Sequence, residues 1–120
     1  MRQVNVQVLS GSDAATVLGS TIDANQLYNA SFHLLVGDAT AAGTFKIQAS
    51  NDICPVGQQA SQFTPTNWVD IPNASVTQAA ATQQAIIQLN NMSYRWLRAV
   101  WTKTTSGTTT VTVNLFAVGA

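Results

Sequence analysis

Residues that could carry out acid–base or nucleophilic chemistry are few in this chain of 120 residues. It contains no glutamate, five aspartates, one histidine (His33) and one cysteine (Cys54). General acid–base catalysis needs titratable side chains within hydrogen-bond reach of one another, and nucleophilic catalysis needs a base beside the nucleophile. These counts leave a Ser-His-Asp triad open, but the Gly-x-Ser-x-Gly turn of many hydrolases does not occur. We therefore predict that the protein is not an enzyme and has no catalytic residue.

The same residues give little support for a metal or cofactor site. Asn51 and Asp52 could contribute oxygen ligands to Ca²⁺, a hard cation that takes several of them. Asn and Asp also occur in turns because their side chains bond to local backbone, and we expect this second role here. Cys54 has no other cysteine for a disulfide and no Cys or His nearby for a metal site. We expect it to be a small loop residue, and we predict neither a metal nor a cofactor.

Composition favours a folded domain that contacts other proteins. The formal net charge is zero, and charged residues make up 8% of the chain, against roughly 25% in an average soluble domain. The sequence has no basic patch for nucleic acid or for an anionic membrane surface, so neither is an expected partner. Its start alternates like a strand instead of forming the apolar run of a signal peptide. Since net charge keeps proteins apart, we expect a homo-oligomer within a larger assembly.

Alternation of apolar and polar residues predicts β-strands along most of the chain. It is clear at residues 3–9, where Val4, Val6 and Val8 face one way and polar residues the other. The expected strands are residues 3–9, 16–22, 27–36, 44–50, 67–71, 74–77, 85–89, 94–103 and 108–118. Residues 51–67 and 79–84 are expected to be loops. Eight or nine short strands without a convincing helix predict one all-β domain over residues 1–120, an antiparallel, jelly-roll-like β-sandwich.

The segment 94–103 is the most apolar part of the chain and carries two of the three tryptophans. Trp96 and Trp101 are predicted to lie on opposite faces of this strand, so they cannot both fill the same core. A strand that is apolar on both faces lies centrally or shows one face to a partner. We expect one of these two indoles to pack against a neighbouring subunit.

Four further residues are candidates for the same interface. Trp68 is a large aromatic residue in or beside the long loop, and aromatic residues and arginine are enriched at interfaces. Arg95 and Arg98 suit bidentate pairing with carboxylates, which we expect to come from across a subunit boundary. His33 lies on the face opposite the apolar residues of its strand, where a structural or interface role is expected. Alternatively, Trp68 or Trp101 could stack on a sugar.

The order of four segments resembles that of a known group of proteins. These segments are GTFKIQASND at 43–52, PTNWVDI at 65–71, YRWLRAVW at 94–101 and SGTTTVTV at 106–113. This order resembles small β-sandwich virion proteins of tailed bacteriophages. In those proteins a strand ending in Ser-Asn-Asp leads to an Asn-Trp turn, then to a Tyr-x-x-Leu-Arg strand and a Gly-Thr-rich terminal hairpin. The resemblance covers roughly residues 43–118.

Such proteins are usually head decoration (cement) proteins, or tail and baseplate components, and they work as trimers or arrays. The resemblance therefore implies a structural virion protein, assembled in the host cytoplasm. The first interpretation of this chain is a capsid decoration protein that forms a trimer and binds the major capsid protein or another virion protein. A tail, baseplate or fibre component is the second interpretation, and a carbohydrate-binding module is the third.

Overall fold

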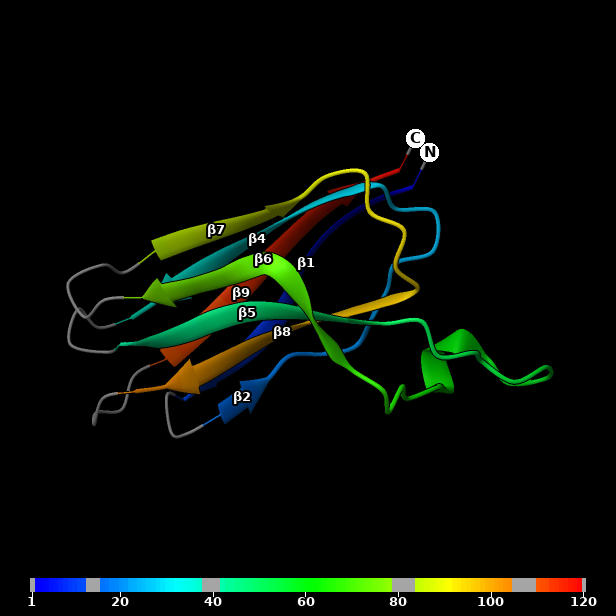
Figure 1. The fold of residues 1–120 in the computed structure, drawn as a ribbon, viewed down its shortest axis with the longest axis horizontal. Helices are drawn as coiled ribbons and strands as arrows, with labels where there is room; N and C mark the ends of the chain where they lie inside the picture. Colours follow the sequence, from blue (N-terminus) through cyan, green and yellow to red (C-terminus); the bar gives the residue numbers. More distant parts are fainter. Residues whose placement is uncertain (1, 13–15, 38–41, 79–83, 105–109, 120) are drawn as a thin grey trace.

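The computed structural model describes residues 2–12, 16–37, 42–78, 84–104 and 110–119, which form two β-sheets packed face to face (Figure 1). The strands are β1 (Gln3–Ser12), β2 (Thr16–Leu18), β3 (Ile22–Asp23), β4 (Asn29–Val36), β5 (Gly43–Ser50), β6 (Val69–Gln78), β7 (Gln84–Leu89), β8 (Trp96–Lys103) and β9 (Thr110–Val118). The described residues contain one short 3₁₀ turn, η1 (Ala60–Gln62), and no α-helix. Within them, no helix is long and apolar enough to cross a membrane.

The strand order is that of a jelly roll. One sheet runs β1-β9-β4-β7 and the other runs β2-β8-β5-β6, with β3 also paired to β8. Between β2 and β3, the Gly19 N–H donates a 2.8 Å hydrogen bond to the Ala99 carbonyl, so the two act as one interrupted edge strand. The antiparallel, jelly-roll-like sandwich predicted from the sequence is therefore confirmed.

The core lies between the two sheets and is built from the inward positions of each strand. In β4 and β5, buried residues alternate with half-buried ones along the strand. Phe32, Phe45 and Trp101 are the largest side chains with no exposed surface in this core. The period-two pattern that predicted these strands is thus the pattern of their burial.

Strand β1 follows the predicted alternation as far as Val8 and departs from it at Leu9. Its register with β9 shifts between Gln7 and Leu9, which marks a β-bulge. After this bulge Leu9 lies opposite Val113 on the inward face, and Val8 is buried as well. Val8 lies in the core against which Val4 packs, as the alternation predicted, and the bulge brings the next residue, Leu9, inward as well.

Strand β6 runs through the position where the sequence predicted two short strands separated by Pro72. It pairs with β5 on both sides of an irregularity, through Asp70 opposite Gln48 and Ser75 opposite Lys46. A proline is tolerated here because β6 is an edge strand, where a missing N–H need not interrupt the ladder. The loop predicted at residues 79–84 lies outside the described residues, except for Gln84, which begins β7.

Gly43 gives a direct test of the packing of Trp101. A Cβ at Gly43 would lie 2.4 Å from the Thr102 carbonyl oxygen and 2.6 Å from the Trp101 ring. We expect Gly43→Ala to lower the free energy of unfolding, measured by urea denaturation, by about 1–3 kcal/mol, as overpacking usually does. Ser75→Ala, an exposed change on the neighbouring strand, should stay within about 0.5 kcal/mol. An unchanged Gly43→Ala midpoint would contradict this packing.

Candidate docking surfaces

Both tryptophans of β8 are buried within the chain, each under a different cover. Trp101 faces the other sheet and has no exposed surface, so it can neither contact a partner nor stack on a sugar. Trp96 faces outward but is only 1% exposed, because the loop at 51–68 lies over it. The Phe63 ring centroid lies 5.4 Å from that of Trp96, whose indole N–H donates to the Asp52 carbonyl at 3.0 Å. The prediction that one of these indoles packs against a neighbouring subunit is therefore wrong.

The Asp52 carboxylate closes the base of this loop. It accepts hydrogen bonds from the backbone N–H groups of Thr66 (2.8 Å) and Asn67 (3.0 Å) and from the Asn67 side chain (2.9 Å). Asn51 accepts a bond from the Arg95 backbone N–H at 2.9 Å. Asn51 and Asp52 bond to backbone as predicted, but this backbone is distant in the sequence and not the local turn that was expected. In the part of the chain that the structure describes, no group of three His, Cys or Asp side chains could hold a metal ion.

Arg95 is held inside the chain on two sides. It forms a salt bridge with Asp23, and its guanidinium lies 4.0 Å from the centroid of the Trp96 ring. An arginine stacked on an aromatic face gains a cation–π attraction in addition to its ion pair. The predicted carboxylate from another subunit is therefore wrong for Arg95, whose partner comes from its own chain.

Arg98 belongs to a row of polar contacts on the outer face of the same sheet. It donates to the Gln48 side chain at 2.7 Å, Gln48 donates to Asp70 at 2.8 Å, and Lys46 lies 3.2 Å from Asp70. Burial lowers the pKa of Arg98. Its guanidinium lies 4.4 Å from the centroid of the Trp68 ring. Trp68, predicted as a contact or a sugar platform, is therefore half-buried with one ring face covered.

The outer face of the sheet β1-β9-β4-β7 carries no Asp, Lys or Arg among its described residues. The single histidine lies on this face. Cross-strand rows on this face are Asn5, Phe116, Ser31 and Gln88; then Gln7, Asn114, His33 and Ile86. Phe116 is 43% exposed and Ile86 62% exposed. His33 is half-buried and hydrogen-bonds through Nε2 to Gln84 Oε1 at 3.0 Å. We call the outward side chains of β1, β9, β4 and β7 the docking face.

The docking face was not recognised from the sequence, although His33 belongs to it. Its signal lies in four segments far apart in the sequence, each alternating without charged residues at the outward positions. Phe116 adds to that signal, because it interrupts the polar side of an otherwise regular strand. The strands become one surface only through the jelly-roll pairing.

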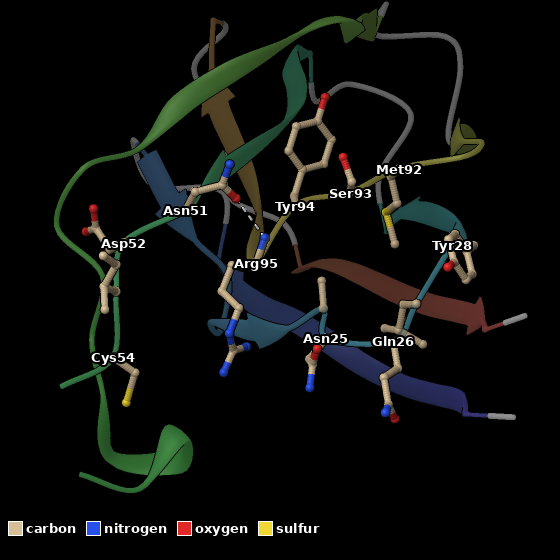
Figure 2. A pocket seen from close by; sticks show the side chains of 13 residues that line it. Asn25, Gln26, Tyr28, Asn51, Asp52, Cys54, Met92, Ser93, Tyr94 and Arg95 are labelled. Carbon is tan, nitrogen blue, oxygen red and sulfur yellow. Dashed lines mark hydrogen bonds between the residues drawn. The ribbon is translucent and has the colours of Figure 1, made fainter. Parts of the chain in front are cut away.

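A cleft of about 620 Å³ opens at the end of the sandwich where the 51–68 loop begins. It lies between the base of that loop and two other connections, residues 24–28 and 90–95. Figure 2 shows the Arg95 side chain between Cys54 on one side and Asn25 on the other. Leu27 and Met92 are buried at this cleft, and Tyr28 is half exposed. Such a lining suits apolar groups and uncharged polar groups.

Comparisons with known proteins show the same fold in viral and prophage proteins. No family model matches the chain, and no curated protein matches it. The SPBc2 prophage-derived protein YomS is similar at a TM-score of 0.52 and 8% identity, over 95% of this chain and 93% of that chain. The Triatoma virus empty capsid gives 0.50 at 10% identity, over 99% and 87%. The K3 adhesin domain of Lys-gingipain from Porphyromonas gingivalis gives 0.45 at 14%, over 92% and 72%.

We expect the carboxylates of Asp52, in the 51–68 loop, and of Asp70, on β6, to titrate low. Hydrogen bonds from Asn67 and Thr66 lower the pKa of Asp52, and the bond from Gln48 is the main cause of the lowered pKa of Asp70. A carboxyl with a lower pKa in the folded chain adds stability above its unfolded pKa, and this is lost as pH falls through the folded value. NMR titration should therefore give midpoints below 3.8 for both. A midpoint at or above 3.8 for Asp52 would contradict its closure of the loop.

Removing the Asp52 carboxylate should loosen the base of the loop. In Asp52→Ala, the backbone N–H groups of Thr66 and Asn67 lose their acceptor, so their hydrogen exchange near neutral pH should accelerate on the order of tenfold. Asp52→Asn keeps one acceptor oxygen and should give a smaller change. Asp70→Asn is the control, because it removes a carboxylate on β6 that bonds to neither amide. It should leave the exchange rates of both amides unchanged. Equal exchange in Asp52→Ala and wild type would show that other contacts hold the loop.

Proposed function

We propose that this chain is a structural protein of a phage particle and, more specifically, a decoration (cement) protein of the capsid shell. The observation that carries this proposal is the docking face, a four-stranded sheet surface without charged side chains among the described residues. Its fold supports the proposal as well, because a prophage-derived protein and a virus capsid share it.

An uncharged face suits a permanent protein contact for energetic reasons. Burying a charged side chain costs several kcal/mol unless a partner compensates it, and the centres of interfaces are depleted of charged residues. On the docking face, amide and hydroxyl side chains can exchange water for hydrogen bonds to a partner. Phe116 and Ile86 supply apolar anchors of the kind that carry most of the binding energy. His33 lies in the same row as Ile86.

The proposed role is mechanical. A sandwich closed by two sheets is a rigid body, and its docking face would bridge neighbouring capsid subunits where packed DNA pushes them apart. The chain would act as a homo-oligomer, with a trimer favoured, on the major capsid protein or another virion protein. Assembly would take place in the host cytoplasm. A tail, baseplate or fibre component would use the same face, so position in the particle separates these two roles.

A sugar-binding role has no platform among the proposed tryptophans. Trp101 is fully buried, and Arg98 lies over one face of the half-buried Trp68. Neither tryptophan therefore favours the carbohydrate-binding interpretation.

A single charge on the docking face should weaken attachment to the particle. Ile86→Asp places a carboxylate on the face at a side chain that is 62% exposed, so folding should be little affected. Purified protein would be mixed with particles of the phage whose genome encodes it, prepared without the protein, and its binding measured by cosedimentation. We expect at least roughly tenfold weaker binding than wild type, because a buried unpaired charge is costly.

Leu18→Asp is the matched control, because Leu18 is equally apolar, is 56% exposed and lies on the other sheet. It should bind like wild type. Wild-type binding by Ile86→Asp would overturn the docking face. Immunogold labelling of intact particles gives the position, and label confined to tails would overturn the decoration role while leaving a virion role.

A further inference from the structure

The 51–68 loop extends past the end of the sandwich as an arm, which we define as residues 53–64. Figure 1 shows it in green, projecting from the end where the described loops and both termini gather. The molecule is accordingly long, with extents of 45 Å against 26 and 23 Å. An arm of this kind is reached easily by a second molecule.

The tip of the arm has a shape built by its own hydrogen bonds. The Gln58 N–H donates to the Pro55 carbonyl at 3.1 Å, and Gly57 has φ 90°, as position three of a type II turn requires. Val56 sits at the apex and is fully exposed, and Ile53 is 86% exposed. Among the described residues, the hydrogen bonds formed by residues 53–62 all have both partners within the arm. The tip is thus a preformed apolar knob.

The cleft beside the base of the arm complements this knob. Its volume of about 620 Å³ could hold several side chains, and Leu27 and Met92 are buried at its lining. Residues 53–69 contain no charged side chain, and Arg95 in the cleft is already neutralised by Asp23. Ile53 touches the cleft, but Val56 does not line it. The tip therefore does not fill the cleft of its own chain.

We infer that the cleft of one copy receives the arm tip of a second copy. Val56 and Pro55 would enter between residues 24–28 and 92–95, where Arg95 is paired with Asp23 and the Asp52 carboxylate is already held by hydrogen bonds. Two copies that exchange arms reciprocally form a two-fold dimer, whereas a one-way contact is heterologous and closes into a ring when its rotation allows. The contact does not use the docking face, so the two proposals can fail separately.

Cross-linking between two single-cysteine copies tests whether the arm tip of a second copy occupies the cleft. In a Cys54→Ser background, one copy carries Val56→Cys and a second, mass-tagged copy carries Gln26→Cys, a residue that lines the cleft. After mixing and treatment with a short bis-maleimide, we expect the mixed dimer to exceed both homodimers at least about threefold. Any mixed dimer is intermolecular by construction. A dominant 56–56 dimer, or no mixed dimer, would overturn the proposal.

Sedimentation velocity measures the consequence for assembly. We expect Val56→Asp to shift the oligomer to the monomer, with association weakened at least about tenfold, and Ser93→Trp to do the same by filling the cleft from its exposed rim. Leu18→Asp changes an exposed apolar residue away from the arm and should keep the wild-type mass. A monomeric wild type, or a Val56→Asp variant of wild-type mass, would overturn the arm contact. Ile86→Asp should keep the oligomer, which separates this result from a failure of the docking face.

Discussion

Burial of strand β8 on both faces is the constraint on which the rest of the structure depends. Inward, Trp101 is covered by the other sheet; outward, Trp96 needs a second cover, which the 51–68 loop supplies through Phe63. A buried indole N–H also needs an acceptor, and the Asp52 carbonyl provides it. The loop is thus fixed at its base by an apolar contact and a polar one. Because the base is fixed, the rest of the loop can leave the body of the protein as an arm and leave a cleft beside it.

The two sheets divide the charge of the protein between them unequally. The charged residues of the described strands all belong to the second sheet, which is the one formed by β2, β3, β8, β5 and β6: Asp23, Lys46, Asp70, Arg98 and Lys103. Three of them, Lys46, Asp70 and Arg98, are linked by hydrogen bonds through Gln48 on the outer face of that sheet. The first sheet carries none among its described residues, and its outer face is polar without being charged. The charged side is therefore the costlier one to dehydrate, and the uncharged side can lose its water when a partner hydrogen-bonds its amides and hydroxyls.

The local sequence pattern was enough to predict most strands, because alternating apolar and polar residues become alternating buried and less buried residues once the strand is in a sheet. Strands β4, β5 and β9 lie within the predicted ranges or one residue beyond them. What failed depends on partners distant in the sequence. Pro72 stops a central strand, but β6 is an edge strand, which only the sheet order shows. Alternation placed Trp96 and Trp101 correctly on opposite faces, yet the cover of Trp96 comes from Phe63, in a loop with no periodic signal. Arg95 likewise finds its carboxylate 72 residues away.

The arm and the docking face point in different directions, and this bears on how modest contacts could give firm attachment. The strands run along the long axis, and the arm continues beyond their end (Figure 1). The docking face, in contrast, is the outer face of the sheet β1-β9-β4-β7. A contact at the end therefore leaves the side free. In a closed ring, symmetry gives every copy the same angle between its docking face and the ring axis. All copies can then engage one surface together, and linked binding raises the total affinity far above that of a single face. A largely polar face with few apolar anchors would suffice in such a ring, and would bind only transiently on a lone monomer.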